Sequence, residues 1–433
     1  MAPVSASRSF VESFGSSLVT LVAGLGTGII AARVLGPSER GVLAQVFFWA
    51  QFLAPLGAIS IADAIVIHAR RGHDVNALVQ QAYILMAKML CLILPVGGVI
   101  ILAAMRGSAT PVVISSLIFW VVQACVMSFD QVTTGSLKNA LRFRVLSITS
   151  ALIPLMYIIS LLIMLVFSRS YLVFVVAQAA ALLLTVLIRF KFSQFGGWST
   201  SVGGNNVQLL ATALNIHRTT VVHLLSSQID RLLVVQTLSN SEIGLYFVAV
   251  SLAGPLQGFI GVAVSQIALS KFVHVTGAAR ELMVERLLRL SWMVSLIGAV
   301  AVVTIAPIVA PLLFGKAFSI SGYVAAGLTA ATATVPVRLV AREASKSMND
   351  NGSPFRAELG FLLGFGAAFI PAFFVGVPYP VIAGLASGNI LSTYLILRAL
   401  AVHMPTISLR RWIIPRWSTF SELFMIVRNA RSG

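Results

Sequence analysis

The chain has 433 residues, of which 58% are hydrophobic and only 10% are charged, and its formal net charge is +17. A soluble domain carries about 25% charged residues, so this composition excludes a water-soluble globular protein and predicts an all-α polytopic membrane protein. In such a protein the positive-inside rule accounts for the excess of Arg and Lys, which leaves no reason to expect nucleic-acid binding.

About twelve apolar segments follow one another along the chain, each close to the roughly 20 residues that a helix needs to cross a bilayer. The predicted spans are 10–32, 42–67, 79–105, 111–137, 145–167, 170–190, 209–237, 242–270, 283–314, 319–344, 356–376 and 378–401. We therefore predict an N-terminal lobe of spans 1–6 (1–190), a cytoplasmic linker (191–208), a C-terminal lobe of spans 7–12 (209–401) and a basic tail (402–433).

Basic residues are unequally shared between the two sides of the membrane. Most of the Arg and Lys residues outside the predicted spans lie on one side, in its connections and in the two termini. The connections on the opposite side hold only Arg40, Arg106, Arg169 and Lys316. Because cytoplasmic loops carry the excess of positive charge, both termini are predicted to be cytoplasmic.

The motif L-x-x-S-E-x-G occurs twice, at 35–41 between spans 1 and 2 and at 238–244 between spans 7 and 8. In each copy the Ser can cap the following helix and the Glu suits the positive end of its dipole. The copies are six spans apart, so both face the same way. This predicts a parallel repeat about an axis along the membrane normal, with two six-helix lobes around the central cavity of an alternating-access transporter.

Span 7 is the least lipid-like span. Five polar side chains lie within an arc of about 80° at helical periodicity: Asn215, Thr219, His223, Ser226 and Asp230, with Arg218 beside them. Polar groups inside a membrane usually face a bundle interior or a water-filled cavity. The stripe therefore predicts either a cavity wall or a polar seam between helices.

Other cations are ambiguous. Arg33 at the end of span 1 and Arg231 near the outer end of span 7 could snorkel to the interface, or could grip a phosphate in a cavity. Lys88 lies too deep in span 3 to snorkel easily. Arg338 and Arg342 share one helix face and predict an interfacial anchor or a cationic vestibule. The substrate-cavity candidates are Arg33, Lys88, Asn215, Arg218, His223 and Arg231.

Three carboxylates within spans, Asp63, Asp130 and Asp230, are candidates for coupling transport to H⁺ or Na⁺. Asp63 and Asp130 could instead form structural ion pairs with Lys88 or Arg33. With two cysteines and no Cys/His ligand spacing, the sequence predicts no metal site. Without a Walker A motif or a large loop, it predicts no cofactor and no catalytic residues.

The run Ile29–Ala44, with its counterparts Ile229–Val234 and Ser241–Ala249, resembles the signature of Wzx-type polysaccharide flippases. These proteins form one branch of the multidrug/oligosaccharidyl-lipid/polysaccharide (MOP) exporter superfamily. The resemblance implies twelve helices in two lobes and a cationic cavity to which Arg33, Asp230 and Arg231 contribute. It further implies that the protein moves an undecaprenyl-diphosphate-linked oligosaccharide to the outer leaflet of the bacterial cytoplasmic membrane.

A flippase for cell-surface polysaccharide is thus the predicted function, and the protein is not predicted to be an enzyme. The first alternative is an ion-coupled small-molecule or multidrug exporter, which should have carboxylates in its cavity because its substrates are mostly cationic. A membrane-embedded polysaccharide polymerase would need a larger outer loop. Besides membrane lipids, a polymerase or glycosyltransferase is a possible partner, and the tail could contact either the membrane or such a partner.

Overall fold

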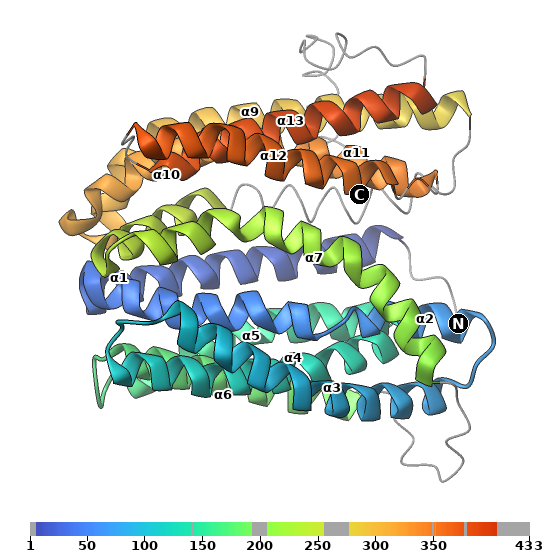
Figure 1. Cartoon of the computed structure of the whole chain (residues 1–433), viewed down its shortest axis with the longest axis horizontal. Helices are drawn as coiled ribbons and strands as arrows, with labels where there is room; N and C mark the ends of the chain where they lie inside the picture. Colours follow the sequence, from blue (N-terminus) through green and yellow to red (C-terminus); the bar gives the residue numbers. More distant parts are fainter. Residues whose placement is uncertain are drawn as a thin grey trace. The chain divides into compact units, whose positions relative to one another are not determined.

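The computed structural model describes residues 6–140, 142–192, 206–254, 277–348, 350, 352–375 and 379–404, with 6–17, 143, 206 and 207 described by their backbone alone. All regular elements within these ranges are helical (Figure 1). The chain divides into two compact units, Met1–Phe247 and Val248–Gly433. The predicted lobe boundary at 191–208 stays a prediction, because most of that linker and of the predicted tail lies outside the described residues.

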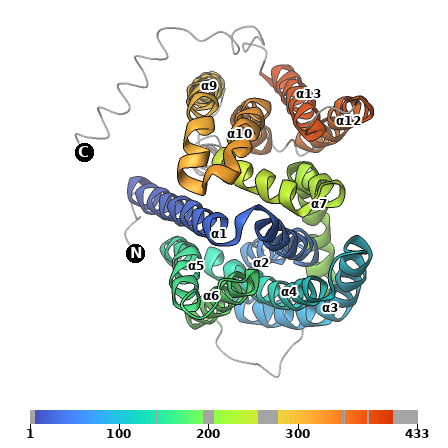
Figure 2. The same cartoon turned by 90° about the vertical axis from the view of Figure 1, so that its left-hand side faces the viewer.

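The first unit is a helical bundle with α4 at its centre, in contact with α1, α2, α3, α5 and α6 (Figures 1 and 2). Its helices are α1 (Ala6–Gly57), α2 (Ile61–Arg70), α3 (Val75–Ala104), α4 (Thr110–Asn139), α5 (Phe143–Met164), α6 (Tyr171–Phe192), α7 (Asn206–Thr237) and the start of a helix over 240–254. Buried aliphatic side chains, including Ile61, Ile65, Val79 and Met86, join α2 to α3.

The second unit is built from α9 (Ala278–Phe314), η1 (Lys316–Phe318), α10 (Ser319–Ala331), α11 (Val335–Ser347), α12 (Gly352–Phe374) and α13 (Pro380–His403). Helix α12 runs along α13, and α9 packs against α10 and α11 (Figure 1). Gly364 and Gly388 lie in the α12–α13 contact, where each approaches the backbone of the other helix. Small residues of this kind allow membrane helices to pack closely.

Within the described ranges, nine helices are long and apolar enough to cross a membrane. Many large apolar side chains on them are exposed, such as Leu92 and Val99 on α3 and Leu187 on α6. Water would not tolerate so many exposed apolar groups, whereas lipid does. The predicted all-α, polytopic membrane architecture is confirmed. Helix α7 is long but is not one of the nine, in keeping with its polar residues.

The backbone breaks at two places, in the predicted connection between spans 1 and 2 and inside predicted span 2. Helix α1 is interrupted at Gly36, whose φ of 68° favours glycine, and Pro37 follows as the first residue of the next segment. Span 2 itself breaks after Gly57, where Ile59 and Ser60 have φ values of 38° and 51°. Positive φ at two consecutive non-glycine residues is costly and needs support from neighbouring groups.

His217 on α7 supplies that support. Its Nε2 donates to the Leu56 carbonyl at 3.0 Å, on one side of the break, and its Nδ1 lies 3.2 Å from Ser60 Oγ on the other. The Ser60 hydroxyl also lies 3.3 Å from Thr220 Oγ1. One buried imidazole therefore connects α7 to both ends of the broken span.

The two L-x-x-S-E-x-G copies begin helices, but not through the predicted serine. In the second copy the helix starts at Asn240, so the capping residue is Ser239. The Ser239 hydroxyl and backbone amide donate to Glu242 Oε2 at 2.6 and 2.9 Å. The prediction that Ser241 caps this helix is wrong, because Ser241 already lies inside it. In the first copy Gly36 takes the place of Ser239, and Ser38 lies within α1.

Candidate functional site

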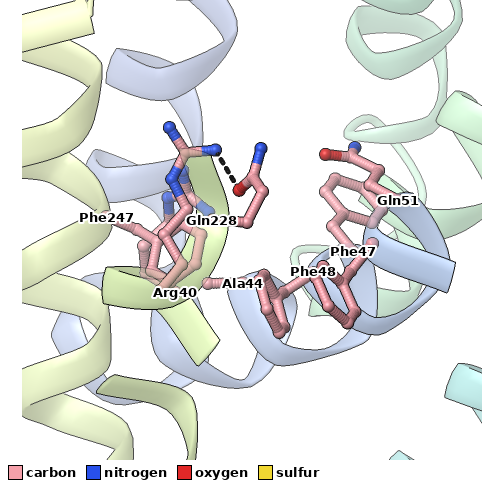
Figure 3. A pocket seen from close by; sticks show the side chains of 9 residues that line it. Arg40, Ala44, Phe47, Phe48, Gln51, Gln228 and Phe247 are labelled. Atoms are coloured by element: carbon pink, nitrogen blue, oxygen red, sulfur yellow. Dashed lines mark hydrogen bonds between the residues drawn. The ribbon is translucent and has the colours of Figure 1, made fainter. Parts of the chain in front are cut away.

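A pocket of about 170 Å³ lies within the first unit, between α1, α7 and the start of the helix over 240–254 (Figure 3). Its lining residues are Arg40, Ala44, Phe47, Phe48, Gln51, Phe52, Gln228, Arg231 and Phe247. Those from α1 follow helical spacing from Arg40 to Gln51, so the second segment of α1 presents one face to the pocket. In Figure 3 Gln51 lies across the pocket from Arg40 and Phe247.

The pocket is cationic. Arg231 Nη1 donates to Gln228 Oε1 at 2.7 Å, which orients the guanidinium. The Nε atoms of Arg40 and Arg231 are both buried and find no hydrogen-bond acceptor among the described residues. No carboxylate of the described residues lines the pocket. Two half-buried guanidinium groups with no carboxylate beside them in the pocket are costly in a site of reduced dielectric, so the pocket is suited to an anionic ligand.

The rest of the lining fits a ligand that combines an anion with polar and apolar surfaces. The Gln51 and Gln228 amides offer both donors and acceptors. Phe47 and Phe48 form an aromatic floor that continues outside the pocket, since the Phe47 ring lies 5.0 Å from that of Phe119. A few convergent polar groups on an aromatic background are typical of small-molecule sites.

Asp230 is next to Arg231 in sequence but does not line the pocket. Its carboxylate is buried and accepts a 2.7 Å hydrogen bond from the Tyr246 hydroxyl. No Lys, Arg or His side chain of the described chain forms an ion pair with it. Of the three predicted coupling carboxylates, Asp230 is the one that the described structure leaves without a cationic partner.

The other two carboxylates are held in ion pairs. Asp63 pairs with Lys138 at 3.1 Å on an exposed surface. Asp130 pairs with Arg189 at 2.7 Å. The alternative in which they pair with Lys88 or Arg33 is therefore wrong: the helix packing brings other cations next to them.

The remaining cavity candidates lie outside the lining of this pocket. Arg33 on α1, Lys88 on α3, and Asn215 and Arg218 on α7 are exposed, and His223 on α7 is half-buried. Of the six cavity candidates, only Arg231 lines the pocket, and the cavity roles of the others remain predictions. The stripe on α7 changes environment along its length, from exposed Asn215 and Thr219 to buried Ser226 and Asp230.

Sequence reasoning missed Arg40, which it assigned to an outer connection as a topological signal only. The available signal was its helical register with Phe47 and Gln51. Near α11, the structure replaces the predicted anchor or vestibule with a buried cluster. Arg338 lies 3.9 Å from Glu358, donates to Ser392 Oγ at 3.2 Å and stacks over the Phe361 ring.

Within the described ranges, no group of three or more His, Cys, Asp or Glu side chains could hold a metal ion. The site in the described ranges is a cationic pocket beside a buried carboxylate.

Comparison with solved structures shows which known proteins share this fold. The chain superposes on the lipid II flippase MurJ in an inward closed conformation with a TM-score of 0.77 and 13% identity, covering 96% of this chain and 92% of that one. An inward-facing multidrug resistance MATE family transporter of the MOP superfamily superposes with a TM-score of 0.65 and 15% identity, covering 91% of this chain and 96% of that one. A MOP superfamily transporter from Pyrococcus furiosus superposes with a TM-score of 0.62 and 16% identity, covering 92% of this chain and 97% of that one.

These similarities confirm the fold predicted from the motifs, that of the MOP superfamily. A comparison with curated proteins found no match. The sequence matches the family described as polysaccharide biosynthesis protein over residues 30–321, more than half of the chain. The chain therefore belongs to the polysaccharide biosynthesis protein family.

Proposed function

We propose that this protein is a flippase that moves a polyprenyl-diphosphate-linked oligosaccharide from the inner to the outer leaflet of a bacterial cytoplasmic membrane. The product would feed the assembly of a cell-surface polysaccharide. The observation that carries the proposal is the pair of Arg40 and Arg231 side chains, which line a pocket with no carboxylate among its described lining residues.

The chemistry of a diphosphate matches this pair. A guanidinium presents several donors in a rigid plane and can bind phosphate oxygens in bidentate fashion. The diphosphate would supply the negative charge that the pocket lacks, and the glutamines and phenylalanines beside it would contact the first sugar. The polyprenyl tail would remain in lipid throughout, so no free energy would be needed to move it into a polar environment.

The predicted orientation favours export. With both termini in the cytoplasm, transfer to the outer leaflet moves two negative charges away from a negative interior. Each charge contributes roughly 2.3 kcal/mol per 100 mV, so the membrane potential alone would favour translocation by about 4–5 kcal/mol.

Coupling to H⁺ or Na⁺ would use Asp230. Its carboxylate is buried, and its hydrogen bond comes from the neutral Tyr246 hydroxyl. Uptake of a cation there would neutralise a negative charge beside Arg231 on the same helix, and that change would strengthen anion binding in the pocket. Asp63 and Asp130 are poorer candidates because each already has a cationic partner.

The alternative is a small-molecule exporter, by analogy with the multidrug resistance transporter of the same fold. A pocket for organic cations requires carboxylates or cation-binding aromatic cages without arginine. The Pyrococcus furiosus transporter is described as having a binding pocket of reverse polarity that suggests a different function. Pocket polarity can thus differ within this fold, and the polarity here favours an anionic cargo.

Reconstitution tests the proposal. Proteoliposomes would carry a fluorescent polyprenyl-diphosphate oligosaccharide, and a membrane-impermeant reagent would report the fraction of headgroups exposed. We expect translocation by the wild type and at least a tenfold loss in Arg40→Gln and Arg231→Gln. Arg169→Gln, an exposed arginine of an outer connection, is the matched control.

Two results would contradict the proposal. The first is the absence of translocation by folded wild-type protein under imposed proton, sodium and voltage gradients. The second is efflux of an organic cation such as ethidium that Arg40→Gln leaves unchanged, which would identify the small-molecule exporter.

A further inference from the structure

Two histidines join the short helix α2 to α7 from opposite directions. His217 on α7 reaches the break before α2, where its Nε2 donates to the Leu56 carbonyl at 3.0 Å and its Nδ1 lies 3.2 Å from Ser60 Oγ. His68, near the end of α2, reaches α7, where its Nε2 lies 3.0 Å from Thr212 Oγ1. Helices α2 and α7 are in direct contact (Figure 1). We call these five residues the histidine latch.

The histidine latch lies in an apolar environment. Both imidazole side chains are buried. Leu209 and Ala213, from the same part of α7, pack into the apolar cluster that joins α2 to α3. A charge placed here would be poorly hydrated, and an unpaired buried charge is costly. The protonation state of the two imidazoles therefore matters for how well α2 packs on α7.

The elements around the latch offer no free carboxylate to a charged imidazole. Asp63 and Asp130 are held in the ion pairs described above, and Asp74 caps the start of α3. The ring of His73 lies 5.3 Å from that of His68, so a proton on one disfavours a proton on the other. Other titratable groups near this end of the neighbouring helices are cations and one tyrosine: Arg70, Arg71, Tyr83, Lys88, Lys138 and Arg218.

The hydrogen bonds of His217 fit a neutral imidazole. Because Nε2 carries the hydrogen donated to the Leu56 carbonyl, Nδ1 can accept from the Ser60 hydroxyl. Protonation would put a hydrogen on Nδ1 as well, and Ser60 would have to turn its own hydrogen toward Thr220 Oγ1, 3.3 Å away. The hydrogen bonds can be rearranged in this way, but the positive charge would stay buried without a counter-ion.

The latch also holds both helices that line most of the cationic pocket. Leu56 follows the lining residue Phe52 by about one turn of α1. His217 lies on the same helix as Gln228 and Arg231. The left-handed backbone between Leu56 and α2 is a strained joint. A change at the latch therefore acts on the position of both walls of the pocket.

We propose that the histidine latch is a proton-binding site that controls the docking of α2 on α7. With both imidazoles neutral the latch is closed. Protons that reach it from the cytoplasmic side, where the predicted topology places the connection after α2, charge the imidazoles and release α2. Histidine has an ordinary pKa of about 6.5, so this change falls between about pH 5 and pH 8. The site is separate from Asp230, and its action on α2 can be tested without any cargo.

The first experiment measures the docking of α2 by hydrogen exchange of the full-length protein in detergent, at about pH 7.5 and about pH 5.5. Exchange rates of residues 61–70 are divided by the intrinsic rates at each pH, and α10 in the second unit is the internal reference. A histidine charged only in the open latch raises the opening constant about tenfold one pH unit below its ordinary pKa. Protection of α2 should therefore fall at least tenfold on acidification, and protection of α10 should stay unchanged.

Replacement of the two imidazoles tests where the protons bind. Gln keeps an Nε2 donor but does not titrate in this range. The double variant His68→Gln with His217→Gln should therefore show the same protection of α2 at both pH values, whatever its level. His403→Gln, in the second unit, is the matched control and should keep the full change. PH-independent protection in the wild type, or an undiminished pH response in the double variant, would overturn the proposal.

A third set of variants reverses the sign of the effect and covers the case in which the double variant does not fold. In the His217→Gln background, Thr212→Asp places a carboxylate opposite His68 Nε2. A protonated His68 then gains a counter-ion in the closed latch, so acidification should raise the protection of α2. Thr212→Asn has the same shape without the charge, and its protection should fall. The same response in the two variants would show that His68 does not bind the proton and would overturn the latch.

Discussion

Nη1 of Arg189 on α6 lies 2.7 Å from both carboxylate oxygens of Asp130 on α4. The same guanidinium donates to Thr149 Oγ1 and to Ser150 Oγ on α5, each at 2.8 Å. One buried side chain thereby fixes three neighbouring helices. Asp130 is consequently better explained as a structural group than as a site for a transported ion.

We expect Asp130→Ala to destabilise the protein by about 3–5 kcal/mol, because it leaves the buried Arg189 guanidinium without its counter-ion. Thermal unfolding in detergent, followed by size-exclusion chromatography, measures the loss. Asp63→Ala is the control, since its pair with Lys138 is exposed and exposed pairs contribute about 0–1 kcal/mol. Equal stability of the two variants would show that the Arg189 cluster does not hold the bundle.

Gln228 positions Arg231, and its replacement distinguishes charge from packing. Gln228→Glu would place a carboxylate against Arg231 and compete with any anion, so we expect the affinity for a short-chain polyprenyl diphosphate to fall at least tenfold. Gln228→Leu removes one hydrogen bond of about 1.5–3 kcal/mol to a charged group and should weaken binding less. Calorimetry in detergent measures both.

The matched control is Gln236→Glu, which adds the same charge to an exposed position on α7 outside the pocket. If Gln236→Glu weakened binding as much as Gln228→Glu, the effect would come from overall charge and not from the pocket.

His217→Phe should loosen the break in span 2. The phenyl ring fills the space of the imidazole but leaves the Leu56 carbonyl and the Ser60 hydroxyl with one partner fewer, at a cost of about 1–3 kcal/mol. The measurement is hydrogen exchange of residues 56–61, which should become faster. Asn215→Ala, an exposed change on the same helix, should leave that exchange unchanged, and a His217→Phe protein with unaltered exchange would contradict the role of the imidazole.

Asp350, in the connection before α12, predicts a pH dependence for the second unit. Burial alone would raise its pKa, but hydrogen bonds from the Ser353 side chain and from the Ser353 and Gly352 backbone amides, with the nearby His403, hold the pKa below its usual 3.8. A lowered carboxyl pKa stabilises the fold at pH values above the unfolded-state pKa. That contribution is lost as the pH falls through the folded-state pKa.

We therefore expect acid unfolding below about pH 4 to depend less steeply on pH in Asp350→Ala than in the wild type. At neutral pH the variant should be less stable by about 0.5–2 kcal/mol, the usual cost of a lost helix cap. If Asp350→Ala were as stable as the wild type at pH 7 and unfolded in acid with the same dependence on pH, this role for the Asp350 carboxylate would be ruled out.

The spans could be predicted from the sequence because length and hydropathy are enough to define them: the predicted span 79–105 corresponds to α3, Val75–Ala104. Breaks within spans could not, because the left-handed backbone at Ile59 and Ser60 depends on His217 reaching it from another helix. A residue pattern along one helix contains no information about a partner in a distant part of the chain.

The candidate site was predictable to the extent that a charge in an apolar segment is visible by itself. Arg231 was found in this way. Arg40 was not, because its position in a connection suggested water, whereas the structure places it in the lining of a pocket shared with α7. The α7 stripe has the predicted angular arrangement, but the neighbours of α7 change along its length, so Asn215 and Asp230 lie in different environments.

The reciprocal backbone contact between the two L-x-x-S-E-x-G copies also limits how the gene can change. A mutation that adds a side chain at position 41 meets the backbone at position 240, and one at 244 meets the backbone at 37. No single substitution elsewhere in either copy can move that backbone away cheaply. Glycine should therefore persist at positions 41 and 244, whereas positions 37 and 240 supply only backbone atoms to the contact and can change their side chains.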